Sequence, residues 1–121
     1  MFKRSFCLCL FVAGPVIAQP AAEPPQIYAA GQPIPVEFNL QERTREGGRT
    51  TPIYGDYRPN VSFDGGSRVE CVVAVPGGGG VEPGTTRDIT LTCPVAVHEG
   101  QGLSAFERDR PIGTGIVTAP Q

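Results

Sequence analysis

VEPGTTRDITLTCPVAVHEGQGLSAFERDRPIGTGIVTAP, residues Val81–Pro120, has the pattern of an antiparallel β domain. Short runs in which apolar and polar residues alternate are separated by turn-forming glycine, proline and acidic residues. Ile89, Leu91 and Cys93 lie two positions apart, which places their side chains on one face of a strand. Three strands are therefore predicted in this segment: Arg87–Val97, Leu103–Glu107 and Ile112–Thr118.

The same alternation is present upstream, again bounded by turn signals. Val36, Phe38 and Leu40 alternate with polar residues, and a glycine pair follows a few positions later. Two more strands are predicted, at Val61–Phe63 and Val69–Val75. No stretch keeps the helical apolar period over several turns, so no amphipathic helix is expected. Short strands spaced about ten residues apart indicate an all-β barrel or sandwich.

The N-terminus has the features of a secretory signal. Two basic residues precede an apolar run, Phe6–Ala18, and small residues stand at Val16 and Ala18, before a cleavage site at Gln19. The run is shorter than the roughly 20 residues of a membrane-spanning helix. A buried N-terminal helix is the alternative interpretation. We expect a secreted or periplasmic protein with no membrane span in its mature form. The predicted divisions are a signal peptide at 1–18, a Pro/Ala-rich linker at 19–33 and a β-barrel at 34–121.

Two cysteines, Cys71 and Cys93, remain after the predicted signal peptide. An even pair in an exported domain favours a disulfide, here closing a loop of 22 residues. Such a loop is worth on the order of 3 kcal/mol in the chain-entropy model. A buried free thiol is the alternative. His98 is the only histidine, so no metal site is expected.

Charge and motifs also limit the functions to be considered. Without the signal peptide, eight arginines face twelve acidic residues and no lysine remains. This acidic balance argues against nonspecific binding to nucleic acid, which depends on neutralising phosphates. GTP binding is not expected, because no GxxxxGKS or GxxxxGKT motif occurs and Pro76–Gly80 lacks the following lysine and helix. That glycine run is predicted to be a flexible hairpin loop, and no cofactor is expected.

From about Val36 to Thr118 the chain resembles the C-terminal domain, domain three, of bacterial elongation factor Tu. The shared motifs occur in the family's order and spacing: Glu46-Gly47-Gly48-Arg49-Thr50-Thr51-Pro52, Asp56-Tyr57-Arg58-Pro59, Pro83-Gly84, Pro94-Val95-Ala96 and Glu107–Val117. The resemblance implies a small six-stranded antiparallel barrel. Independently of the resemblance, two glycines within a strand, Gly113 and Gly115, predict a bend or close backbone approach at a barrel corner.

The resemblance implies binding residues as well. In that family this domain contacts the T-stem of aminoacyl-tRNA and the nucleotide-exchange factor, and Arg49, Thr50 and Arg110 occupy tRNA-contacting positions. The chain departs from the family at Thr50, where a histidine is usual, and at Arg108-Asp109, where two glycines are usual. These departures, together with the acidic balance, argue against tRNA binding.

The other charged residues support two interpretations. Arg43, Arg45, Arg49 and Arg58 form a basic cluster that could bind an acidic partner or a polyanion. Alternatively they are a charged hairpin offset by neighbouring glutamates. No nucleophile and base are specified by any motif, so no enzyme activity is expected. The leading hypothesis is a noncatalytic extracytoplasmic binding module for an unknown protein partner. The alternative is a translation-related role in which it binds tRNA or an elongation-factor partner.

Overall fold

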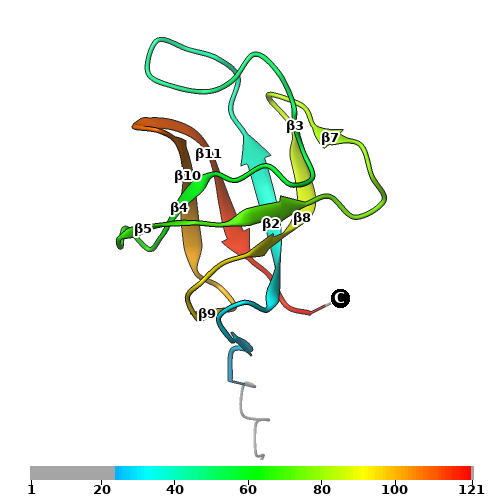
Figure 1. The fold of residues 1–121 in the computed structure, drawn as a ribbon, viewed down its shortest axis with the longest axis vertical. Coiled ribbons are helices and arrows are strands. Elements are labelled where there is room, and N and C mark those ends of the chain that lie inside the picture. The colour runs from blue at the N-terminus through cyan, green and yellow to red at the C-terminus, as the bar shows by residue number, and fades with distance from the viewer. Residues whose placement is uncertain (1–23, 121) are drawn as a thin grey trace, which may run out of the picture.

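The computed structural model describes residues 24–120, and the predicted signal peptide lies outside them. Figure 1 shows this part of the chain as a barrel of antiparallel strands. Its strands are β1 (Ile27–Tyr28), β2 (Pro33–Leu40), β3 (Ile53–Tyr54), β4 (Asn60–Phe63), β5 (Arg68–Glu70), β6 (Val72–Ala74), β7 (Gly80–Val81), β8 (Thr86–Thr92), β9 (Val97–His98), β10 (Gly102–Glu107) and β11 (Arg110–Val117). Within residues 24–120 there is no helix, and so none of a length and apolarity to cross a membrane.

The main sheet has the order β5-β4-β10-β11-β2-β8-β6, with every neighbouring pair antiparallel. Its two outermost strands, β5 and β6, are separated by Cys71 alone, so one bent strand lies at both edges and nearly closes the sheet. The Cys71 and Val73 amides also donate to the carbonyls of Pro59 and Tyr57, at 3.0 and 2.9 Å. Counted with β5 and β6 as one strand, this is the predicted six-stranded barrel.

The barrel interior is filled by the apolar residues of the alternating pattern. Val36, Phe38 and Leu40 on β2 are buried, and so are Ile89 and Leu91 on the neighbouring β8. The predicted face assignments of these two strands are therefore confirmed. Burying aliphatic side chains in this way is the main stabilising contribution to such a fold, at about 25 cal/mol per Å² of apolar surface.

Cys71 and Cys93 are both buried in this core and form the predicted disulfide between neighbouring strands. Val72 pairs with Thr92 in the β6–β8 ladder, and the two cysteines are the next opposing residues in the same register. Their Cα atoms are 4.4 Å apart, the spacing of a non-hydrogen-bonded antiparallel pair. The bond therefore closes the barrel at the point where the bent strand passes from β5 to β6.

The folded unit begins earlier than the predicted boundary at residue 34. β1 pairs with β9, and Tyr28 is only 2% exposed. Its hydroxyl donates to the Thr118 carbonyl at 2.8 Å, and the Gly31 amide donates to the Cys93 carbonyl at 2.8 Å. Residues 27–33 of the predicted linker thus cover the lower end of the barrel in Figure 1 rather than forming a tether. A single buried tyrosine in a Pro/Ala-rich run gives no periodicity by which to recognise this.

Gly113 lies where the backbone of β11 passes close to that of β2. A Cβ atom at this position would be 2.5 Å from the Asn39 carbonyl oxygen, which no side chain tolerates. The register of β10 against β11 also shifts between Ala105 and Phe106, just beside it. The predicted close backbone approach is therefore confirmed here, and it bends the strand pair toward the upper end of the barrel.

Candidate functional site

The upper end of the barrel carries the loop between β2 and β3, residues 41–52. The Thr44 amide donates to the Gly47 carbonyl at 2.7 Å, and the Thr44 hydroxyl accepts from the Gly47 amide at 3.3 Å, which forms a tight turn. Gly48 has a φ of +84°, and its amide donates to the Pro111 carbonyl at 2.8 Å. A Cβ atom on Gly47 would be 2.2 Å from that same oxygen. The glycine pair therefore fixes the loop against the start of β11.

Arg49 and Arg110, two residues that the resemblance singles out, meet at Glu107 on β10. Arg49 donates to Glu107 Oε2, and Arg110 Nη2 donates to Glu107 Oε1 at 3.0 Å. The Tyr57 hydroxyl also donates to Oε2 at 2.8 Å, and the Arg49 guanidinium lies 5.1 Å from the centre of the Tyr57 ring. We call these four residues the Glu107 cluster. It joins the 41–52 loop, the segment before β4 and the β10–β11 hairpin.

The ionisation of the Glu107 cluster follows from its partial burial and its internal bonds. Burial raises the pKa of Tyr57 to about 12, and the hydrogen bond and negative charge of Glu107 add to the shift. Burial alone would raise the pKa of Glu107 too. The Tyr57 hydrogen bond and the charges of Arg49 and Arg110 outweigh it and lower that pKa below its ordinary value. At neutral pH the cluster is a carboxylate bound by two cations and a neutral phenol.

The geometry brings Arg49 and Arg110 together but directs their guanidinium groups to Glu107. Arg49 has a side-chain exposure of 17%, so little of it faces solvent. Thr50, the third residue implied by the resemblance, is exposed. The Arg49 side chain therefore helps to hold the upper end together through its bond to Glu107.

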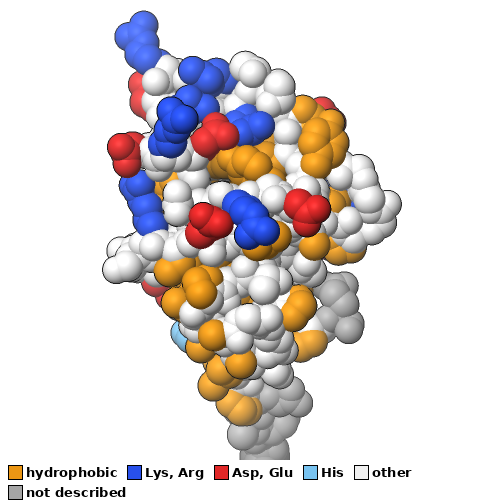
Figure 2. Space-filling model, viewed as in Figure 1, with side chains coloured by type: hydrophobic (Ala, Val, Ile, Leu, Met, Phe, Trp, Pro, Cys, Tyr) orange, Lys and Arg blue, Asp and Glu red, His pale blue; other side chains and the backbone are white. Residues whose placement is uncertain are grey.

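The remaining predicted basic residues differ in their contacts. Arg43 and Arg45 are exposed on the 41–52 loop and form no ion pair within the described part of the chain. Arg58 instead lies 3.8 Å from Glu70 on β5, with both side chains about 60% exposed. Figure 2 shows arginines gathered at the upper end of the molecule, with a few acidic side chains among them. The free positive charge on the loop is therefore that of Arg43 and Arg45.

The turn between β10 and β11 adds a residue that the sequence reasoning did not select. Arg108 is exposed and has a φ of +59°, an uncommon backbone conformation for a residue other than glycine. Its carbonyl accepts from Arg68 Nη1 at 3.2 Å. The sequence signal at this turn is Arg108-Asp109, at positions where the elongation factor Tu domain usually has two glycines.

The Pro76–Gly80 loop was predicted to be flexible because of its glycines, but its backbone is bonded to a side chain of β8. The Arg87 guanidinium on β8 donates to the carbonyls of Pro76, Gly78 and Gly80 at 3.0, 2.7 and 2.9 Å. The loop is wrapped around this side chain, which satisfies three backbone acceptors. A lone arginine at the start of a strand gives no sequence signal for such a contact.

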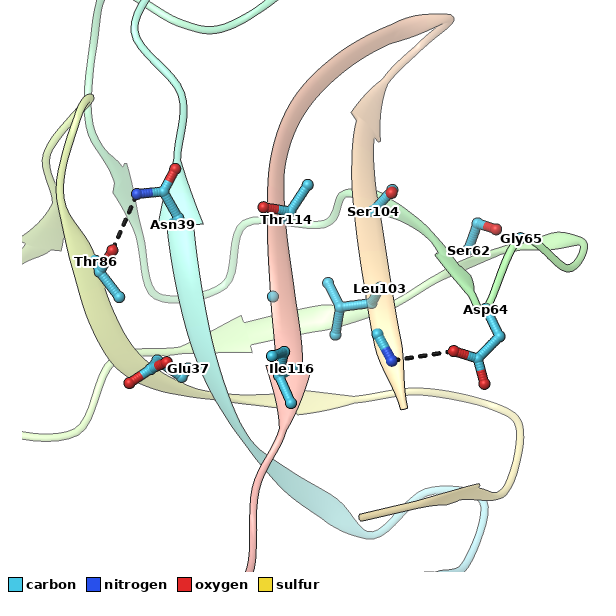
Figure 3. Close-up of a pocket in the computed structure, with 12 residues that line it drawn as sticks. Glu37, Asn39, Ser62, Asp64, Gly65, Thr86, Leu103, Ser104, Thr114 and Ile116 are labelled. Atoms are coloured by element: carbon cyan, nitrogen blue, oxygen red, sulfur yellow. Dashed lines mark hydrogen bonds between the residues drawn. The ribbon is translucent and has the colours of Figure 1, made fainter. Parts of the chain in front are cut away.

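A polar groove of about 470 Å³ crosses the outer face of the sheet. Figure 3 shows a row of short polar side chains, one from each of five neighbouring strands: Thr86, Asn39, Thr114, Ser104 and Ser62. Several are already paired, since the Asn39 amide donates to Thr86 Oγ1 at 2.9 Å and the Ser62 hydroxyl to the Gly66 carbonyl at 2.7 Å. The carboxylate of Asp64 at the rim accepts from the Gly102 amide at 3.1 Å. We therefore regard the groove as a polar outer surface.

No group of three metal-ligating side chains is found within residues 24–120. His98 is exposed on β9, at the opposite end from the Glu107 cluster, and its Nδ1 lies 3.0 Å from the Glu99 carbonyl. The candidate site is thus the arginine-bearing upper end, defined by the 41–52 loop and the β10–β11 turn.

No known protein-family model matches this chain. The fold described above therefore rests on the structure itself. The likeness to the elongation factor Tu domain rests on the sequence motifs alone.

Proposed function

We propose that this protein is a noncatalytic, extracytoplasmic binding module that contacts a protein partner through its arginine-bearing upper end. One observation carries the proposal. Arg43 and Arg45 have no ion pair in the described structure, yet the loop that bears them is fixed to β11 at Gly48 and Pro111. A rigid loop presents its charges without a large loss of conformational entropy on binding, which favours affinity.

The near-closure of the barrel supports the same surface. Strand edges would be the other route to a protein contact, because unpaired backbone groups accept an added strand. Here one bent strand, β5 and β6, lies at both edges of the main sheet. The loops at the barrel ends are therefore the better candidates.

The placement of the chain ends also supports it. Pro24 and Pro120 line one small hollow at the lower end of the barrel, together with Glu99 and Gly100. The 41–52 loop lies at the opposite end (Figure 1). A module attached through either described end would leave its arginine-bearing end free to meet a partner.

The proposed location outside the cytosol has two supports. The first 18 residues have the features of a secretory signal. The Cys71–Cys93 bond is of the kind that persists in oxidising compartments and is rare in the cytosol. Cell fractionation with intact-mass measurement tests this part. A protein found in the cytosol with Met1 retained and both thiols free would reject it.

The partner contact is tested by affinity capture from an envelope extract with the whole exported chain. We expect a captured protein that is lost with Arg43→Ala plus Arg45→Ala and kept with Arg58→Ala. The last variant is a matched control, because Arg58 is an exposed arginine with a single long contact to Glu70. Equal capture by all three proteins would contradict the proposal.

The translation-related alternative is favoured by one observation, the meeting of Arg49 and Arg110 at the upper end. Both are held by Glu107, which leaves less of their charge for phosphates. Filter binding of aminoacyl-tRNA at low salt distinguishes the two functions. Measurable affinity that falls with salt would favour the alternative, and its absence would reject it.

A further inference from the structure

We infer that Arg108, at the tip of the β10–β11 hairpin, is a contact residue for a partner segment rich in carboxylates, and that it acts together with Arg43 and Arg45. This inference rests on the proposed function, and it names the chemistry of the partner. Three observations support it: the backbone conformation of Arg108, the rigidity of the turn and the distribution of charge at this end.

The backbone of Arg108 is the first observation. Glu107 pairs with Arg110, so Arg108 and Asp109 are the two central residues of a tight hairpin turn. With a φ of +59°, Arg108 occupies a position where glycine is strongly favoured in such turns. Two aspartates, Asp56 and Asp64, also have positive φ, but aspartate tolerates this region far better than arginine. Arg108 therefore destabilises the fold locally, and strain of this kind is concentrated at functional sites.

The rigidity of the turn is the second observation. Arg68 stacks on the Phe106 ring, with 3.8 Å from its guanidinium carbon to the ring centre, and donates to the Arg108 carbonyl at 3.2 Å. Arg68 also lies 3.4 Å from the carboxylate of Asp109, the residue that follows Arg108. The Arg108 guanidinium itself has no ion pair within residues 24–120. Its backbone is held while its charged group stays available.

The charge distribution selects the class of partner. Arg43, Arg45 and Arg108 are interspersed with Glu42, Glu46 and Asp109, all exposed. A nucleic acid presents a continuous row of phosphates, which these carboxylates would repel. An acidic peptide can place separate carboxylates opposite separate arginines, and each guanidinium can bind one through two parallel hydrogen bonds. The arrangement favours an acidic peptide over a nucleic acid.

The test measures affinity and stability together, with the whole exported chain. The probe is a fluorescent oligoglutamate, compared with an uncharged oligoglutamine and with single-stranded DNA of equal length. Arg108→Gly should raise Tm because it relieves the backbone strain, and should weaken oligoglutamate binding roughly two- to fivefold, as for an exposed charge pair. Arg108→Lys should leave Tm nearly unchanged and weaken binding less. Arg58→Ala, which removes the same charge elsewhere, should leave binding unchanged.

Two results would overturn the inference. One is weaker oligoglutamate binding with Arg43→Ala plus Arg45→Ala but unchanged binding with Arg108→Gly, which would leave the proposed function standing. The other is tighter binding of DNA than of oligoglutamate, or no binding of either, which would reject an acidic peptide as the partner. In that second case the capture experiment with Arg43→Ala plus Arg45→Ala decides separately whether the proposed function holds.

Discussion

The two ends of this barrel are closed by different means. At the lower end, β1 covers the core with the buried aromatic ring of Tyr28, and the hydroxyl of that side chain donates to the Thr118 carbonyl. At the upper end, the Glu107 cluster joins the loops through charges and hydrogen bonds. Tyr28 is buried and its hydroxyl is already bonded, so it offers no group to a partner. Beside the Glu107 cluster, by contrast, Arg43, Arg45 and Arg108 are exposed and form no ion pair within residues 24–120. The lower end is therefore expected to contribute more to stability, and the proposed partner contact lies at the upper end.

The largest loss of stability is expected from removing Tyr28, whose ring closes the lower end of the barrel. Tyr28→Ala should lower the free energy of unfolding by roughly 3–5 kcal/mol, the range for a buried aromatic residue replaced by alanine. Urea unfolding of the whole chain measures it. Tyr28→Phe is the matched control. It keeps the ring and loses only the bond to the Thr118 carbonyl, so a loss of about 1 kcal/mol is expected. If Tyr28→Ala costs less than 1 kcal/mol, the apolar lower end is not where stability is concentrated.

The disulfide should come next. It lies just after β8, on the side of the barrel closed by β1. Replacing both Cys71 and Cys93 by alanine should destabilise the protein by about 3 kcal/mol, as expected for a loop of 22 residues. Thermal unfolding with and without reductant gives an independent value for the natural chain. A Tm that reductant does not change, with both thiols shown to be free, would contradict a stabilising bond.

Breaking the Glu107 cluster should have a smaller effect, of about 1–2 kcal/mol, because its side chains are partly exposed and solvent screens their charges. Glu107→Gln keeps the shape and removes the charge, and Tyr57→Phe is a control that removes only the hydroxyl. The pKa of Glu107 is lowered in the fold, so the carboxylate stabilises the protein above its ordinary pKa of 4.5. That contribution is lost as the pH falls below this value. Urea unfolding from pH 7 to pH 3 should show a smaller acid loss for Glu107→Gln than for the natural chain, and parallel curves would contradict the assignment.

Much of this architecture could be predicted from the sequence, and the failures have physical causes. The alternation at Val36, Phe38 and Leu40 predicts the buried face of β2, because side chains in a strand point alternately to opposite faces. The role of Tyr28 could not be predicted, since a two-residue strand has no period to detect.

The site was predicted less completely than the fold. Arg43 and Arg45 were selected as a basic cluster together with Arg49, but nothing in the sequence shows that Arg49 is bound by Glu107, which lies 58 positions away. The conformation of Arg108 likewise depends on the two-residue length of its turn, which sequence alone does not fix. Contacts between distant segments decide which arginines are free, and such contacts leave no local pattern.

The smallest change in stability is expected for the two exposed arginines of the 41–52 loop. Arg43→Ala plus Arg45→Ala should change the free energy of unfolding by less than about 0.5 kcal/mol, because both side chains are exposed and unpaired within the described structure. Partner capture should nevertheless be lost. Arg49→Ala should instead lower the free energy of unfolding, because it leaves Glu107 with one fewer cation. If Arg43→Ala plus Arg45→Ala destabilises the protein as much as Arg49→Ala, the two arginines belong to the closure of the upper end. A stability change confined to Arg49→Ala instead separates the residues that hold this end together from those that meet a partner.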